Sequence, residues 1–276
     1  MACWRAVTTS GSEPDTRADL ALALQLADIA DAITLPRFRA ADLKVTRKPD
    51  RTPVTDADTA AEEALRASLA GERPADAILG EEGGGSLAGL GGRGWVLDPI
   101  DGTKNFSRGM PVWGSLIALC VAGAPTVGVV SAPALGRRWW GAAGLGAWTT
   151  DRPGGEARRI TVTGVRSLED SYLSTTNVET FRGNGTLDRW LALSEACWET
   201  RAFGDFWQHC LVAEGVLDLA VEPEANPWDL AAVQPILEEA GGRLTDLAGV
   251  VGFAGGNGLA SNGHLHTAAL EILRAR

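Results

Sequence analysis

The segment 95–106, WVLDPIDGTKNF, constrains this chain more than any other part of its sequence. Its first residues are apolar and predict a buried strand that ends at Asp98, and Asp101 follows after a proline and an isoleucine. Proline fixes its own φ angle and lacks an N–H, and the glycine at 102 lets the backbone approach a ligand closely. The segment therefore predicts a tight turn that directs two carboxylates and the carbonyl of Ile100 toward one point.

The residues after this turn extend the pattern. Thr103 adds a hydroxyl, and a helix that begins there would direct its free N–H groups at the same point. An Asp-Pro turn in which Asp101 only caps a helix explains the same letters equally well. The segment alone leaves both readings open.

Composition narrows the choice of partners. Of the 276 residues, 45% are hydrophobic, which is enough for one large domain or two closely joined halves. The formal net charge is −10 and no basic stripe opposes it, so nucleic acid and anionic membranes are excluded as expected partners. A small anionic substrate would need local positive charge, which a metal can supply.

The four cysteines are scattered without CxxC spacing, which indicates free thiols in a reducing compartment. No apolar run reaches the length that spans a membrane. Residues 1–15 contain no apolar core of a signal peptide, so we expect a short disordered leader and a cytoplasmic protein.

Strand and helix patterns alternate along most of the chain, which predicts an α/β fold with sheets layered between helices. Expected helices cover 16–38, 55–70, 186–197, 205–215, 227–242 and the C-terminus. Expected strands cover 78–82, 95–98, 112–123, 126–133, a hairpin at 137–148, 159–163, 171–176, 199–203, 216–223, 243–246 and 258–262.

Other acids occur at strand ends and helix starts, namely Glu81, Glu82, Asp56, Asp58 and Asp229. Each has an ordinary role available, because helix caps and first-turn acids are common. Asp58, for example, completes a capping box with Thr55. In a layered α/β fold such ends line crevices, so these carboxylates can also converge. Converging carboxylates repel one another, and carboxylates with a carbonyl form the ligand set that suits Mg²⁺.

Three further patterns in the sequence are weak evidence for a function. The GxG spacings near 83–92 and 141–148 do not join a strand to a helix, so a dinucleotide site is not expected. His264 and His266 are not expected to bind a metal. The DADT letters at 56–59 imitate the DxDxT motif of haloacid-dehalogenase-like phosphatases only in part, and they open a helix and do not follow a hydrophobic strand.

Taken together, the motifs resemble those of the inositol-monophosphatase-like, Mg²⁺-dependent phosphatases. The residues that carry the resemblance are TPVTDAD (52–58), GEE (80–82), WVLDPIDGTKNF (95–106), WDLAA (228–232) and EAGG (239–242). They are separate motifs in the right order, and the resemblance extends from about residue 18 to near the end of the chain.

Within this family the chain is most similar to the actinobacterial type of histidinol-phosphate phosphatase. The carriers are DGTKNFSRGMPVWGSLIAL, VSAPALGRRWW and RAFGDFWQHCLVAEG. Inositol phosphatases usually have a second threonine in place of Lys104 and a small residue in place of Asp205. Pro235, inside the helix expected at 227–242, departs from a regular helix and predicts a kink there.

The resemblance implies a layered α-β-α-β-α sandwich in two halves, 16–165 and 166–276, and usually a homodimer. The first half would carry most metal ligands and the second would supply Asp229 and the residues of the substrate pocket. About two or three Mg²⁺ ions per site are implied. Their implied ligands are Glu81, Asp98, the Ile100 carbonyl, Asp101 and Asp229.

The resemblance also implies the roles of the remaining site residues. Asp56 and Thr103 would orient and deprotonate the attacking water, with Glu81 also in the catalytic set. The amides of Gly102 and Thr103 would hold the phosphate. The residues that would face the rest of the substrate are Asp205, Glu222, Arg201 and the metal ligand Asp229.

An acidic pocket wall suits an amine, and the alcohol of histidinol phosphate carries an ammonium and an imidazole. Asp205 and Glu222 therefore favour histidinol phosphate over inositol phosphate or a sugar phosphate, which stay open as alternatives. A metal-binding regulatory protein on an inactive phosphatase scaffold is a more remote alternative, because all implied ligands and the implied dyad are present.

Overall fold

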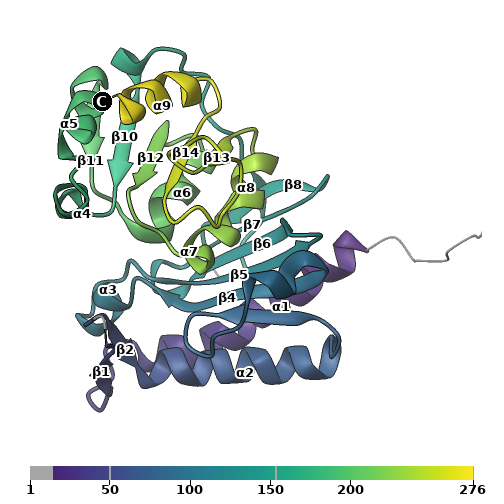
Figure 1. Cartoon of the computed structure of the whole chain (residues 1–276). Coiled ribbons are helices and arrows are strands. Elements are labelled where there is room, and N and C mark those ends of the chain that lie inside the picture. The colour runs from purple at the N-terminus through teal and green to yellow at the C-terminus, as the bar shows by residue number, and fades with distance from the viewer. Residues whose placement is uncertain (1–14, 50, 153, 276) are drawn as a thin grey trace, which may run out of the picture.

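The computed structural model describes residues 15–49, 51–152 and 154–275 and has five layers (Figure 1). Helices α1 and α2 cover one face of a seven-stranded sheet. Helices α6 and α8 lie between this sheet and a five-stranded sheet, and α4, α5 and α9 cover the outer face of the latter. The predicted α-β-α-β-α sandwich is confirmed.

Helices α1, α2, α5 and α6 begin and end close to the predicted residues, whereas α4 was not predicted. The helices described are α1 (Thr16–Arg37), α2 (Asp56–Glu72), α3 (Thr103–Ser107), α4 (Val178–Gly183), α5 (Leu187–Ala196), α6 (Asp205–Ala213), α7 (Pro227–Ala231), α8 (Val233–Glu239) and α9 (His266–Arg274). Short 3₁₀ turns lie at Leu87–Gly91, Pro133–Leu135 and Leu168–Asp170.

The seven-stranded sheet has the order β3-β4-β5-β6-β7-β8-β9, and only the β3–β4 pair in it is parallel. Its strands are β3 (Ala77–Gly80), β4 (Arg93–Asp101), β5 (Gly114–Val121), β6 (Ala124–Ala132), β7 (Arg137–Ala142), β8 (Gly146–Thr150) and β9 (Arg158–Arg159).

The five-stranded sheet has the order β11-β10-β12-β14-β13. Its strands are β10 (Tyr172–Thr175), β11 (Glu199–Arg201), β12 (Leu219–Glu222), β13 (Arg243–Thr245) and β14 (Gly258–Ser261). A separate antiparallel hairpin joins β1 (Val45–Arg47) to β2 (Pro53–Thr55) beside α3.

The two sheets follow one another along the chain, since the first uses residues 77–159 and the second residues 172–261. One apolar core nevertheless joins them, with Trp139 of the first sheet and Ala220 of the second in the same cluster as Phe206 of α6. The division into halves at residue 165 stays a prediction.

The helix expected over 227–242 is interrupted between α7 and α8. Pro235 has no N–H to donate to the carbonyl of Ala231, which explains why the interruption falls at Ala232. Here α8 approaches the first sheet so closely that a Cβ on Gly128 would lie 2.0 Å from the Ala232 carbonyl oxygen. This contact fixes α7, and with it Asp229, against the sheet.

The strand expected to end at Asp98 continues to Asp101. Its pairing with β5 shifts register between these two residues, so the strand carries an irregularity and not a turn there. The turn comes one residue later, at Gly102, whose φ of 83° is a conformation that favours glycine. Helix α3 begins directly after it.

The predicted leader, residues 1–15, lies outside the described residues except for Asp15. The carboxylate of Asp15 accepts from the amides of Arg17 and Ala18 and caps α1. Among the helices described, none combines the length and the apolar character needed to cross a membrane.

Candidate active site

Three carboxylates from two distant parts of the chain meet at the end of β4. Asp98 and Asp101 come from the irregular end of the strand, and Asp229 comes from the first turn of α7. One carboxylate oxygen of each lies within 4.8 Å of the others. We call this group the carboxylate cluster.

Backbone contacts hold each carboxylate in place. The Asp98 Oδ1 accepts from the Ile100 N–H at 3.0 Å, and the Asp101 Oδ2 accepts from the Phe206 N–H at 2.6 Å. The Asp229 Oδ2 accepts from the Asn226 N–H at 2.7 Å as part of a capping box. Helix α6, which begins at Asp205, therefore helps to position a residue of β4.

Burial and like charges both act on the cluster. Burial is the main cause that raises the pKa of Asp98 well above its ordinary value, and the charges of Glu81 and Asp101 raise it further. Burial likewise raises the pKa of Asp229 to about 7. Within the described part of the chain, no Lys, Arg or His forms an ion pair with a cluster member.

Oxygen ligands that crowd together without an internal cation fit a hard divalent ion. The Ile100 carbonyl belongs to the same strand end, and it accepts the Thr103 hydroxyl at 2.9 Å. The residues present therefore fit Mg²⁺, as the sequence indicates.

Glu81 is held differently from the other expected ligands. It follows β3, and its carboxylate pairs with Lys48 Nζ at 2.7 Å, as does that of Glu82. Lys48 follows β1, so this double ion pair ties the β1–β2 hairpin to the edge of the site. Glu81 nevertheless raises the pKa of Asp98, which indicates that its charge acts on the cluster.

The predicted pairing of Asp56 with Thr103 is wrong. The Thr103 hydroxyl lies 3.2 Å from Asp58 Oδ1, whereas Asp56 accepts from Arg37 Nη2 at 2.8 Å. Asp58 is the third residue of α2, and its other oxygen accepts from the Thr55 N–H at 2.9 Å in the predicted capping box. That bond turns Asp58 back into the protein, while Asp56 at the first position faces Arg37.

Burial is also the main cause that raises the pKa of Asp58 to about 6. The capping box was the sequence signal that identifies Asp58 as the inward acid.

A pocket of about 400 Å³ opens beside the carboxylate cluster. Of the predicted substrate residues, Asp205, Glu222 and Asp229 line it. Lining residues to which the sequence analysis gave no site role are Thr52, Lys104, Thr176, Asn177, Thr180, Phe206, His209, Glu224, Ala225 and Asn226. They come from helices α3, α4 and α6 and from loops between distant elements, so no local pattern marks them.

The two predicted acids of this pocket are firmly placed. Asp205 has a φ of 49° and accepts from Asn105 Nδ2 at 2.9 Å. Glu222 accepts from the Thr176 hydroxyl and from Gln208 Nε2, both on Oε1, which leaves Oε2 for other contacts. Burial is the main cause that raises the pKa of both carboxyls.

Two other residues predicted to contact the substrate, Gly102 and Arg201, differ in their position relative to this pocket. Gly102 lies against the pocket, since a Cβ added to it would lie 3.4 Å from Asp205 Oδ2. Arg201, in contrast, does not line the pocket. It pairs with Glu199 at 2.6 Å and lies over the Tyr172 ring, because the edge strand β11 directs it outward. The predicted contact of Arg201 with the substrate stays a prediction, since the structure shows only that Arg201 is not among the residues that line this pocket.

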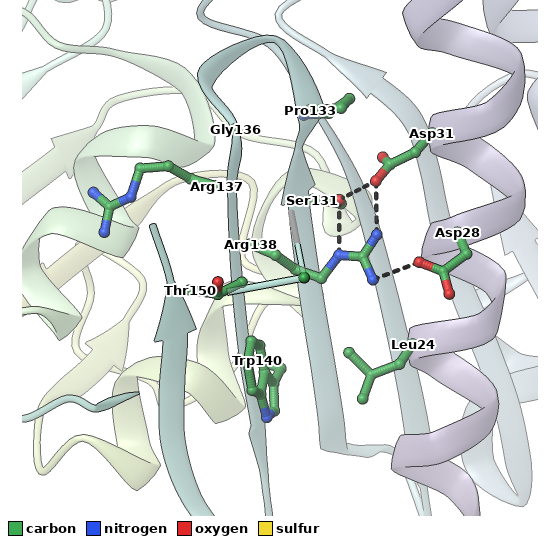
Figure 2. Close-up of a pocket in the computed structure, with 11 residues that line it drawn as sticks. Leu24, Asp28, Asp31, Ser131, Pro133, Gly136, Arg137, Arg138, Trp140 and Thr150 are labelled. Carbon is green, nitrogen blue, oxygen red and sulfur yellow. Dashed lines mark hydrogen bonds and ion pairs between the residues drawn. The ribbon is translucent and has the colours of Figure 1, made fainter. Parts of the chain in front are cut away.

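A second pocket, of about 320 Å³, lies between α1 and strands β6 to β8 (Figure 2). Its centre is Arg138, which donates to Ser131 Oγ at 3.0 Å, to Asp28 Oδ1 at 2.8 Å and to Asp31 Oδ2 at 2.6 Å. We call it the α1 pocket. Its charges are already paired with one another, so it lacks the unrelieved charge that marks the active site.

Comparison with known proteins defines the class of this phosphatase. The model of the inositol monophosphatase family matches residues 15–276, and the chain belongs to this family. A solved inositol monophosphatase from Zymomonas mobilis is 34% identical and superposes with a TM-score of 0.81 over 95% of this chain and 100% of its own.

Within the family, two similar curated relatives are histidinol-phosphatases. The one from Mycobacterium tuberculosis is 52% identical over 93% of this chain and 98% of its own length. The one from Streptomyces coelicolor is 51% identical over 95% of this chain and 99% of its own length. The predicted family and phosphatase class are confirmed.

Proposed function

We propose that this chain hydrolyses L-histidinol phosphate to L-histidinol and inorganic phosphate, a step of histidine biosynthesis. The observation that carries the proposal is the acidic wall beside the carboxylate cluster, formed by Asp205 and Glu222. The two histidinol-phosphatase relatives support the same substrate.

The acidic wall fits the alcohol part of that substrate. A phosphate monoester places its phosphate at the cluster and its alcohol in the adjoining pocket. An ammonium on the alcohol can there receive charged hydrogen bonds from Asp205 and from the free Oε2 of Glu222. A neutral polyol gains no such charged contact.

The metal ligands that we propose are Glu81, Asp98, the Ile100 carbonyl, Asp101 and Asp229, with about two or three Mg²⁺ ions as the family resemblance implies. When bound, Mg²⁺ neutralises phosphate oxygens and makes a water easier to deprotonate. The amides of Gly102 and Thr103 lie where α3 begins and would donate to the phosphate.

Asp58 and Thr103 would handle the attacking water. The Thr103 hydroxyl donates to Asp58 or to the Ile100 carbonyl, so its lone pairs can accept a hydrogen bond from water. The water oxygen forms a bond to phosphorus as the bond from phosphorus to the alcohol oxygen breaks. A water proton passes through Thr103 to Asp58, and the departing alcohol oxygen takes up a proton from solvent water.

The test is kcat/KM for histidinol phosphate, inositol 1-phosphate and glycerol phosphate at fixed Mg²⁺. We expect histidinol phosphate to be preferred by about tenfold or more, the size of a charged hydrogen bond. A preference for inositol 1-phosphate or for a sugar phosphate would replace the proposed substrate, and metal binding without turnover would favour the inactive scaffold.

The resemblance also leads us to propose a cytoplasmic homodimer. Light scattering after size exclusion measures the assembly, and a monomer at micromolar concentration would contradict it.

A further inference from the structure

A cleft of about 380 Å³ lies between the β1–β2 hairpin and α3, next to the active-site pocket. Four cationic residues line it, namely Arg47, Arg51, Lys104 and Arg108. We call it the basic cleft. Lys104 lines the active-site pocket as well, so the two spaces adjoin at this residue.

The three arginines of the basic cleft have no ion-pair partner among the described residues, and the charge of Lys104 acts on Asp205 of the active-site pocket, where it opposes the rise in the pKa of that carboxyl. Across the described residues none of the four forms an ion pair or donates a side-chain hydrogen bond, whereas most other arginines pair with carboxylates. The cleft is as large as a sphere about 9 Å across, so its charges lie within roughly one Debye length of each other.

The local structure explains why these cations converge. Arg47 is the last residue of β1, and it lines the cleft from the hairpin side together with Val45 and Thr46. From Thr103, a helix rises about 1.5 Å per residue, which places Arg108 within about 8 Å along α3. The cleft therefore begins beside the residue that contacts Asp58.

We propose that the basic cleft is a subsite for a second phosphate-class oxyanion. Two arginines can each hold phosphate oxygens through paired N–H donors, and Lys104 adds a third charge. The anion can be a second phosphate on the substrate or free inorganic phosphate. The active-site pocket is acidic on the side of Asp205 and Glu222, so the mouth of the site would separate cationic from anionic substituents.

The experiment compares the wild type with the double variant Arg47→Gln/Arg108→Gln. The matched control is Arg166→Gln, an exposed arginine that also lacks a partner but precedes the opposite end of β10. Hydrolysis of glycerol phosphate, with Mg²⁺ present, serves as the assay. The inhibition constants of inositol 1-phosphate and inositol 1,4-bisphosphate are measured against it.

We expect the double variant to weaken inhibition by the bisphosphate about tenfold, because two exposed charged contacts are lost. Inhibition by the monophosphate and the turnover of glycerol phosphate should change less than about twofold, and Arg166→Gln should change neither. Calorimetric titration of the EDTA-treated proteins with inorganic phosphate is the second arm. Binding to the wild type that the double variant lacks would identify free phosphate as the occupant.

Equal weakening of both inhibitors would mean long-range attraction without a subsite and would overturn the proposal. So would the absence of any effect in both arms. Neither result depends on histidinol phosphate, so this proposal and the proposed substrate can fail separately.

Discussion

The carboxylate cluster and the α1 pocket each contain an acid whose pKa is raised by partial or full removal from water, namely the buried Asp98 and the half-buried Asp31, yet the two sites compensate for this in opposite ways. Asp31 in the α1 pocket meets Arg138, which opposes the rise in its pKa. The charged neighbours that act on Asp98 in the cluster are other acids, which add to the rise. The same cost of removing a carboxylate from water is offset from within the chain in one pocket and left open in the other.

The difference separates structural charge from functional charge. Arg138 completes the α1 pocket as soon as the chain folds, so that pocket needs no ligand. The cluster is completed only when a cation arrives from outside, and the free energy of that contact becomes available for binding. The basic cleft resembles the cluster in this respect, except that its charges are positive and the ion that we propose to complete it is an anion.

The largest expected effect is the loss of activity when the metal is removed, because only the cluster depends on an external cation. We expect EDTA to abolish phosphatase activity and Mg²⁺ to restore it. Asp98→Asn should lower kcat/KM by at least about 10³-fold, because a metal is worth several kcal/mol to the transition state. Asn at this position can still accept from the Ile100 N–H, so the strand end should be preserved.

The same Asp98→Asn variant should lose activity but gain stability. In EDTA, Asp98→Asn should melt at a higher temperature than the wild type, because the acid with a raised pKa destabilises the folded state above its ordinary pKa. Full activity of metal-free wild type, or a lower melting temperature of the variant in EDTA, would contradict this account.

The next largest effect should distinguish two acids in one helical turn. Asp58→Asn should lower kcat by about 10²–10⁴-fold, because it removes the group that receives the proton. Asp56→Asn is the matched control and should keep kcat within about twofold, since Arg37 retains Asp42 as a partner. The measurement is kcat for glycerol phosphate at saturating Mg²⁺, and the reverse order of the two variants would return the role to Asp56.

These two acids also show what the sequence can and cannot predict. The cluster was predictable because each member belongs to a local motif: Asp98 and Asp101 end one strand, and Asp229 opens one helix. Asp58 belongs to a predicted motif too, but which first-turn acid faces inward depends on how the capping box turns its side chain.

The position of Arg201 outside the pocket has a different physical cause. Its direction depends on the position of β11 at the edge of a sheet, which comes from pairing with β10 and not from the residues around it. The remaining lining residues of the pocket lie on loops and on helices α3, α4 and α6, which only the packed layers bring together. The layered fold itself was predictable because strand and helix patterns are local, and Pro235 marked where the helix breaks.

A smaller effect should test whether the acidic wall selects the substrate. Asp205→Asn removes the charge but tolerates the positive φ and can keep the bond from Asn105, so it is a better variant than alanine. We expect kcat/KM for histidinol phosphate to fall about ten- to a hundredfold, the worth of a charged hydrogen bond. The value for glycerol phosphate should change little, and an equal loss for both would mean that Asp205 serves the site in general, for example through Asn105.

The smallest effect should come from the internally paired pocket, and it should appear in stability alone. Asp31→Asn leaves Arg138 with one fewer charged partner, and Asp28, which is largely exposed, cannot fully replace it. We expect the free energy of unfolding to fall by about 1–2 kcal/mol in urea titrations, the usual range for a partly buried charged hydrogen bond. Mg²⁺ should leave this loss unchanged, and kcat for glycerol phosphate should equal that of the wild type. A change in kcat with an unchanged stability would show that the α1 pocket communicates with the active site, and the distinction between the two pockets would then fail.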